Sequence, residues 1–317
     1  MHGGFNKEGL KIRKAVVALG GNALEDPLKG SNFDPERLKV AASAVDTVLQ
    51  AGYSVAVTHG NGPQAGELLQ ALLLSGNPLA TRLDIVVAMT QAQIGYALSQ
   101  EIENLTKKRA YVVCTRVLVS SKDSAFQRPT KPIGKYYTEA EAKKLQSLGV
   151  NFKRFDVKGS TLYRQVVPSP EPLEIVEGEL IFRMLEQGLL VVSCGGGGIP
   201  VVLEDGSFKG VNAVIDKDLA SAKLAESINA DLLLILTSVD YVFENYDKPN
   251  QRALTKLATR EARKMLESGV FEEGSIAPKV LACTRFVEKT GKTAIITSLE
   301  RVKEGLNGEV GTHFFKG

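Results

Sequence analysis

Cysteine is sparse in this sequence, and its charges nearly cancel. The three cysteines, Cys114, Cys194 and Cys283, are far apart and form no CxxC pair. They provide neither a disulfide framework nor a cysteine metal site, so a cytoplasmic location is expected. A formal net charge of +3 over 317 residues is too small to indicate nucleic acid or a membrane surface as a partner.

Long apolar runs are absent as well. The nearest candidate, 189–203, is interrupted by four glycines, so we expect no membrane-spanning segment. Residues 1–14 are polar and lack an apolar core, which is not the pattern of a secretory signal. The sequence is 44% hydrophobic and 24% charged, as in globular proteins that bury a substantial core.

Short apolar runs alternate with helical patterns along most of the chain. The dipeptide Asp34-Pro35 opens one such helix, with an N-cap followed by proline at the first helical position. This alternation predicts a mainly parallel sheet covered by helices on both faces. The predicted strands are 15–19, 53–58, 111–119, 189–194, 231–237 and 294–297, with Phe314 and Phe315 closing the sheet; the predicted helices include 84–98, 138–148, 174–187, 255–267 and those that start near Lys217 and Pro278.

Residues 120–172 interrupt this alternation. They contain five prolines, many charges and a single helical pattern. Long irregular stretches inside a compact fold are uncommon and usually functional. We interpret 120–172 as an inserted flap subdomain within one domain that spans 1–317.

Four glycine-rich loops lie at predicted junctions between strands and helices, at 20–22, 60–62, 195–198 and 274–279. Glycine lets backbone N–H groups approach anionic oxygens closely. Each loop alone could be only a tight turn. Because ligands of such sheets bind outside the carboxyl ends of the strands, the four loops together predict a shared anion-binding site.

Neither standard nucleotide fingerprint fits the sequence. The stretch 60–65 imitates the dinucleotide motif, but only Asp84 could supply the acidic residue that should follow, and it lies beyond a predicted helix. The stretch 291–293 imitates the end of a P-loop. Phe286 stands where the first glycine of that motif belongs, and a strand follows instead of a helix.

Three lysines are distinguished by their surroundings. Lys217 lies between Asp216 and Asp218 at the predicted start of a helix, where unpaired backbone N–H groups favour anions. Lys279 also begins a helix, and Lys131 lies in a proline-flanked loop of the insertion. Phosphoryl transfer needs positioned cations and backbone donors, which makes these lysines candidate catalytic residues. The alternative interpretation is a capping Asp216 beside a solvent-facing Lys217.

The same stretches resemble the carbamate kinase family, within the amino-acid kinase superfamily. The matching segments run in family order over nearly the whole chain: A-L-G-G-N-A-L at 18–24, T-H-G-N-G-P-Q-A-G at 58–66, P-T-K-P-I-G at 129–134, V-V-P-S-P-E-P at 166–172, G-G-G-I-P-V at 196–201, V-I-D-K-D-L-A at 214–220 and P-K-V at 278–280. The resemblance implies an α/β/α sandwich around a mainly parallel eight-stranded sheet, and a homodimer. It also implies the reversible reaction of ATP and carbamate to ADP and carbamoyl phosphate, with Mg²⁺.

The resemblance further implies roles for the candidate residues. Lys217 and Lys279 would flank the phosphoryl group in flight, with Asp218 holding both lysines and Asp216 assisting, while Lys131 would reach from the flap towards carbamate. No direct protein ligand to a metal is assigned. The N-terminal half (14–119 and 173–210) would bind carbamate and the phosphoryl group through Gly20, Gly21, Asn22, Gly60, Asn61, Gly62, Gly196 and Gly197; the C-terminal half (211–317) would bind the nucleotide through Thr237, Asp240, Tyr246, Gly274, Ser275 and Lys279.

Other interpretations stay open from the sequence. The chain could be a related kinase that acts on another small carboxylate or phosphate, or a non-catalytic nucleotide-binding regulator. Cys194 precedes a glycine run with no histidine nearby in sequence, which favours a buried strand-end cysteine over a catalytic thiol. For His59 we favour a loop-stabilising hydrogen bond over a general base, because carbamate is already anionic.

Overall fold

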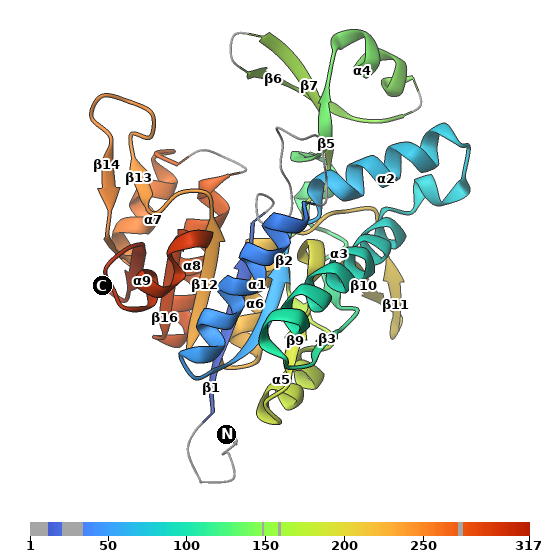
Figure 1. The fold of residues 1–317 in the computed structure, drawn as a ribbon. Helices are drawn as coiled ribbons and strands as arrows, with labels where there is room; N and C mark the ends of the chain where they lie inside the picture. The colour runs from blue at the N-terminus through green and yellow to red at the C-terminus, as the bar shows by residue number, and fades with distance from the viewer. Residues whose placement is uncertain (1–11, 21–33, 148, 158–159, 272–274) are drawn as a thin grey trace.

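A computed structural model describes residues 12–20, 34–147, 149–157, 160–271 and 275–317. Its centre is an eight-stranded sheet (Figure 1). Neighbouring strands run parallel except for one antiparallel pair, β16 with β17, which confirms the predicted mainly parallel sheet. In spatial order the strands are β15 (Lys256–Ala258), β17 (Thr312–Phe315), β16 (Thr293–Ser298), β12 (Leu232–Thr237), β1 (Arg13–Leu19), β2 (Tyr53–His59), β9 (Leu190–Val192) and β3 (Ala110–Val112).

Strand β1 illustrates why the central strands are continuously apolar. Ala15, Val17 and Leu19 belong to one hydrophobic cluster, and Val16 and Ala18 belong to another. Successive side chains of a strand point to opposite faces of the sheet, and all five are fully buried. Both faces of the sheet are therefore covered, as in other parallel sheets.

Helices form a layer on each face. The first face carries α1 (Pro35–Gln50), α3 (Leu83–Thr106) and α9 (Val302–Leu306); the second carries α5 (Gly178–Glu186), α6 (Lys217–Ser227), α7 (Thr259–Glu267) and α8 (Ile276–Thr290). Helix α1 starts as predicted, because Asp34 accepts the backbone N–H of Glu36 over 2.9 Å and Pro35 is its first residue. The arrangement confirms a three-layer α/β/α sandwich.

Smaller sheets surround this body. A four-stranded sheet contains β11 (Ser207–Gly210), β10 (Ile199–Glu204), β4 (Arg116–Leu118) and β8 (Glu174–Ile175), and β13 (Val242–Glu244) pairs with β14 (Arg252–Leu254). A third sheet, β5 (Lys131–Tyr137), β7 (Ser160–Val167) and β6 (Phe152–Val157), stands with α4 (Glu139–Gln146) at the top of Figure 1, apart from the main body. We call this third sheet with α4 the flap; its status as an inserted subdomain spanning 120–172 stays a prediction.

Three predicted elements are wrong in detail. Residues 111–119 form two strands in two different sheets, since β3 pairs with β9 and β4 pairs with β10 and β8. Between the two strands, Thr115 donates its backbone N–H to the Gln91 side chain over 2.9 Å. Residues 174–187 begin with the strand β8 before α5, and 255–267 begin with the strand β15 before α7. In the last two cases, pairing with a strand distant in sequence overrides a local helical pattern.

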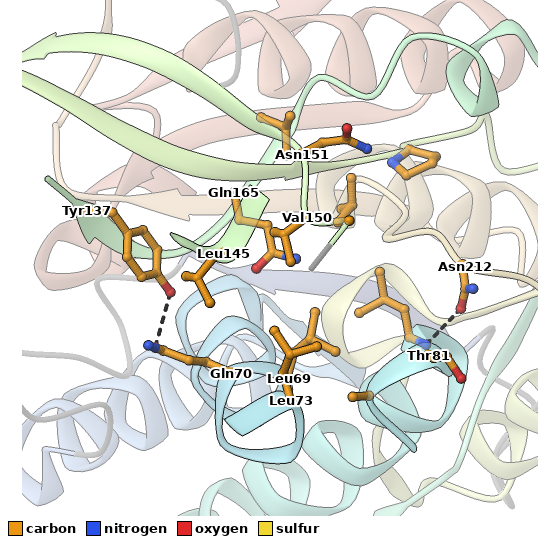
Figure 2. Close-up of a pocket in the computed structure, with 16 residues that line it drawn as sticks. Leu69, Gln70, Leu73, Thr81, Tyr137, Leu145, Val150, Asn151, Gln165 and Asn212 are labelled. Atoms are coloured by element: carbon orange, nitrogen blue, oxygen red, sulfur yellow. Dashed lines mark hydrogen bonds between the residues drawn. The ribbon is translucent and has the colours of Figure 1, made fainter. Parts of the chain in front are cut away.

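The flap is anchored to α2 (Gly62–Leu74) by a close backbone contact. A Cβ added to Gly66 of α2 would lie 2.1 Å from the Cα of Gly134 in β5. Gly134 has a φ of +67°, a left-handed conformation that glycine adopts without strain. Farther along β5, the Tyr137 hydroxyl donates to Gln70 Oε1 over 3.1 Å beside a cavity of about 320 Å³ (Figure 2). Strand β5 therefore extends from this cavity to Lys131 at its opposite end.

Within the described residues, no helix combines the length and the apolar character that crossing a membrane requires.

Candidate active site

The carboxyl ends of β1, β2 and β12 meet at one edge of the main sheet. Gly20 donates its N–H to the carbonyl of Leu236 over 3.1 Å, and Gly60 donates to the carbonyl of Leu19 over 3.3 Å. A Cβ at Gly20 would lie 3.0 Å from the Leu236 oxygen, so glycine permits this close approach. Ligands of open parallel sheets bind at this edge. The predicted residues Gly21 and Asn22 lie outside the described residues.

The glycine loop after β9 folds against the loop after β2. Gly196 and Gly197 have φ values of +64° and +87°, in the left-handed region that favours glycine. The carboxamide of Asn61 packs against Gly196, since a Cβ added to Gly196 would lie 2.2 Å from Asn61 Nδ2. Gly197 packs against the carbonyl of Ile215, since a Cβ added to Gly197 would lie 2.2 Å from the Ile215 oxygen. The glycine loop therefore contacts both the β2 loop and the residue that precedes the acidic triplet.

Asp216 uses its two carboxylate oxygens on different elements. Oδ1 accepts the backbone N–H groups of Asp218 over 2.9 Å and of Leu219 over 3.3 Å, and so caps α6. Oδ2 forms an ion pair with Nζ of Lys131. The start of α6 is thereby tied to the flap.

Asp218, in the first turn of α6, binds two lysines from different helices. Its Oδ1 accepts a hydrogen bond from Lys217 Nζ, and its Oδ2 accepts one from Lys279 Nζ over 3.1 Å. Lys279, near the start of α8, also donates to the carbonyl of Ser275 over 3.1 Å. The Lys217 side chain is only 10% exposed. Asp216 is thus a cap, but Lys217 does not face solvent as the alternative interpretation required.

Burial and charge oppose each other in this cluster. Burial raises the pKa of Asp218, but the charges and hydrogen bonds of Lys217 and Lys279 outweigh it and hold the pKa of this carboxyl well below its usual value. Burial lowers the pKa of Lys217, and the neighbouring Lys279 ammonium lowers it further against the effect of Asp218. Burial also acts to lower the pKa of Lys279, but Asp218 outweighs it and the pKa of Lys279 is raised. Asp218 is therefore ionised at neutral pH and acts as a counter-ion.

The cluster carries an excess of positive charge. Three lysines, Lys131, Lys217 and Lys279, pair with two carboxylates, Asp216 and Asp218, which leaves one formal positive charge. Fixed cations and backbone N–H groups stabilise the charge that develops on a transferring phosphoryl group. The site can therefore support phosphoryl transfer without a covalent nucleophile.

His59 and Cys194 are buried beside the glycine loops. Burial lowers the pKa of His59 to about 4, and the Lys217 charge also lowers it, while a hydrogen bond between Nδ1 and the Gly60 carbonyl over 2.9 Å opposes the shift. His59 is therefore neutral at neutral pH. Burial raises the pKa of the Cys194 thiol, which keeps it protonated and unreactive.

Two of the residues predicted to bind the nucleotide, Thr237 and Asp240, lie at the carboxyl end of β12 and just beyond it. Thr237 ends β12, and Asp240 accepts the hydroxyl of Ser298 over 2.5 Å. Asp240 is thus tied to the end of β16 rather than to the lysine cluster. Tyr246 is 61% exposed, and Gly274 lies outside the described residues.

A protein-held metal does not fit the donor set in the part of the chain that the structure describes. No three His, Cys, Asp or Glu side chains there group as a metal site. Asp216 and Asp218, the two acids of the lysine cluster, are both engaged by lysines.

Helix α3 contributes two residues that are missing from the predicted set. Thr90 and Gln91 are 0% and 3% exposed, and their side chains bond to Asn61 and to the carbonyl of Gly195. One signal in the sequence is this pair of adjacent polar residues within a helical pattern. The same signal is equally compatible with a solvent-exposed helix face.

Known proteins are similar to this chain in both sequence and fold. The amino acid kinase family model matches residues 13–298. The carbamate kinase of Clostridium perfringens (strain 13 / Type A) is 44% identical over 317 residues, covering 96% of this chain and 100% of that protein. The carbamate kinase of Pyrococcus furiosus is 42% identical, covering 95% of this chain and 98% of that protein. The solved structure of carbamate kinase from Giardia lamblia bound to AMP-PNP has a TM-score of 0.85 and 40% identity, covering 96% of this chain and 99% of that one. The chain therefore belongs to the amino acid kinase family and, within it, to the carbamate kinases.

Proposed function

We propose that this chain catalyses reversible phosphoryl transfer between ATP and carbamate, which yields ADP and carbamoyl phosphate. Its relatives named carbamate kinase support this assignment. The observation in the molecule that carries it is the pairing of Lys217 and Lys279, from two helices, with the single carboxylate of Asp218. Such pairing offers fixed cations to a phosphoryl group, as this reaction requires.

In the proposed reaction, Lys217 and Lys279 stabilise the charge on the oxygens of the transferring group. A carbamate oxygen attacks the γ-phosphorus of ATP, the bond from that phosphorus to the bridging oxygen breaks, and ADP leaves with the electron pair. Because Asp218 holds both ammonium groups before substrate binds, little reorganisation is needed. The proposed cradle for the substrate oxygens comprises Gly20, Gly21, Asn22, Gly60, Asn61, Gly62, Gly196 and Gly197.

We assign Lys131 to the carbamate end of the substrate. Lys131 comes from the flap, and its partner Asp216 begins the helix that carries Lys217. An anionic substrate offers Lys131 a second partner. Binding of carbamate or carbamoyl phosphate is therefore expected to compete with the ion pair between Lys131 and Asp216.

We assign the nucleotide to the C-terminal half, with Thr237, Asp240, Tyr246, Gly274 and Ser275 as contacts. In this proposal Mg²⁺ arrives on the phosphate oxygens of the nucleotide, the usual way in which proteins use it with phosphates. A chelator is expected to abolish turnover and to leave the melting temperature of the nucleotide-free protein unchanged. A lower melting temperature would instead indicate a metal bound by the protein itself.

We further propose a homodimer that forms through α3 and the edge strand β3, which lie on the same side of the molecule (Figure 1). Met89 and Tyr96 of α3 and Tyr111 and Val112 of β3 are exposed apolar side chains, and neighbouring apolar side chains of this size mark interaction surfaces. The two elements touch, since a Cβ added to Gly95 would lie 2.6 Å from Val112. Light scattering should give the mass of a dimer for the native protein and of a monomer for Tyr96→Glu; a monomeric native protein would refute this proposal. A cytoplasmic location stays a prediction from the sparse cysteines.

The decisive assay is ATP formation from ADP and carbamoyl phosphate. The native protein is expected to form ATP well above background. ATP formation only with another acyl phosphate or phosphate donor would support a related kinase instead. ADP binding without turnover would support a nucleotide-binding regulator.

A further inference from the structure

Thr90 and Gln91 lie beneath the two loops to which we assign the substrate oxygens. Both are buried in the middle of α3, although burying a polar side chain costs free energy unless its hydrogen bonds are made. Each of them bonds to one of these loops. Through these two bonds, α3 contacts the loops that carry the hydrogen-bond donors of the site, although α3 provides none of its charged groups.

Thr90 orients the carboxamide of Asn61. The Thr90 hydroxyl has one hydrogen, which it donates within α3 to the carbonyl of Val86 or of Val87, each 3.0 Å away. Its oxygen accepts one N–H of Asn61 Nδ2 over 2.8 Å. Among the described residues, the second N–H of the same amide has no partner, so an anion can accept it. Because Asn61 also lies on Gly196, its carboxamide is held between α3 and the glycine loop.

Gln91 fixes the glycine loop itself. Its Nε2 donates to the carbonyls of Thr115 and Gly195, each over 3.0 Å, and its Oε1 accepts the backbone N–H of Thr115 over 2.9 Å. In a trans peptide the C=O and the following N–H point in opposite directions. Because Gln91 draws the Gly195 carbonyl towards α3, the N–H of Gly196 points away from α3.

We propose that Thr90 and Gln91 are positioning residues for the phosphoryl-transfer reaction. Thr90 sets the orientation of the Asn61 amide, and Gln91 sets the direction of the Gly196 N–H, so that both donors address the same substrate anion. This inference rests on the proposed function. It also explains which residues of α3 hold the proposed cradle for the substrate oxygens in place.

Kinetics of matched variants test the role of Thr90. Thr90→Val keeps the shape of the side chain and removes the hydroxyl, so kcat/KM for carbamoyl phosphate is expected to fall about tenfold, the scale of one neutral hydrogen bond, with KM for ADP unchanged. Thr90→Ser restores the hydroxyl and should recover the activity. The control is Thr284→Val in α8, because Thr284 is equally buried and its hydroxyl donates within α8 to the carbonyl of Val280 over 2.7 Å, with no bond to a glycine loop among the described residues. An equal loss in Thr284→Val, or equal effects on both substrates, would overturn the proposal for Thr90.

Hydrogen exchange tests Gln91 without turnover. Amides 195–197 are expected to exchange faster in Gln91→Leu than in the native protein, and no faster in Thr284→Val. Unchanged exchange in Gln91→Leu would overturn the role of Gln91. If the native protein forms no ATP, the proposed function fails while the exchange result still decides whether Gln91 fixes the loop. If ATP forms and neither variant changes its measured property, the positioning proposal alone fails.

Discussion

Asp218→Asn is the sharpest test of the lysine cluster. The substitution keeps the shape of the side chain but removes the carboxylate to which both Lys217 and Lys279 bond. The formal charge of the cluster rises from +1 to +2, and the new amide N–H₂ must face one of the two ammonium groups. Removing one partner of a buried ion pair costs about 3–5 kcal/mol. We expect a loss of this size in the free energy of unfolding at pH 7, and a fall in turnover of about 10²-fold or more because the cations lose their positions.

The stability loss has a defined dependence on pH. In Asp218→Asn, burial still acts to lower the pKa of both lysines, but the opposing effect of Asp218 is gone. We therefore expect both pKa values to fall below that of a lysine in the unfolded chain. The unfolded state then binds more protons, so stability rises with pH. The deficit of Asp218→Asn relative to the native protein should therefore shrink between pH 7 and pH 10.

Urea unfolding and steady-state ATP formation measure the two effects separately. The matched control is Asp231→Asn, at the opposite end of the sheet, where Asp231 pairs with Lys292 and accepts the backbone N–H of Lys14 over 3.1 Å. This control should lose stability and keep its turnover. The reasoning is refuted if Asp218→Asn retains turnover within a small factor of the native value, or if Asp231→Asn loses turnover to the same extent.

Other predictions concern single residues of the site and its surroundings. Lys217→Ala should lower turnover by about 10²-fold or more, as expected for a lost transition-state donor, and near-native ATP formation would exclude Lys217 from the reaction. Lys131→Ala should raise KM for carbamoyl phosphate by about tenfold or more, the scale of a charged hydrogen bond, and change the Kd of ADP little in calorimetry; equal changes would contradict the assignment of Lys131. The pKa of the buried His59 is about 4 in the folded protein and about 6.5 in the unfolded chain. Between these values the unfolded chain binds the proton and the folded protein does not, so stability falls as the pH drops from about 6.5 to about 4. At pH 5 the loss is about 2 kcal/mol relative to pH 7, and urea unfolding of His59→Gln should lack this component. Gly66→Ala places a Cβ 2.1 Å from the backbone of Gly134 and should cost about 1–3 kcal/mol of stability as an overpacked contact. An unchanged unfolding curve would show that the backbone at Gly134 moves aside without a cost in stability.

The main sheet and its helices could be predicted because they depend on local patterns. An apolar run such as the one in β1 is typical of a strand buried on both faces, and the Asp34-Pro35 start of α1 depends on residues adjacent in sequence. The lysines could be singled out because each has unusual neighbours along the chain. Their resemblance to a family then associated residues that are far apart in sequence.

Features that depend on contacts between distant segments could not be predicted. Strand β15 forms because it pairs with β17, more than 50 residues later in the sequence, and no pattern in residues 256–258 indicates that partner. Thr90 and Gln91 have roles only because two loops, one before and one far after them in sequence, fold onto the same turn of α3. The contact between Gly66 and Gly134 is likewise a property of two elements meeting, and neither glycine indicates the other.

Asp216 can be described as an anion that the protein supplies to its own site. Its carboxylate occupies Lys131, the lysine that we assign to the substrate, while its other oxygen stays bound to the start of α6. A tethered ligand competes at an effective concentration in about the millimolar range or above. An incoming anion binds Lys131 only if it outcompetes this carboxylate, and a doubly charged phosphate does so better than a singly charged ion. With the role that we propose for Lys131, the resting ion pair disfavours singly charged anions, carbamate among them, and favours the doubly charged carbamoyl phosphate.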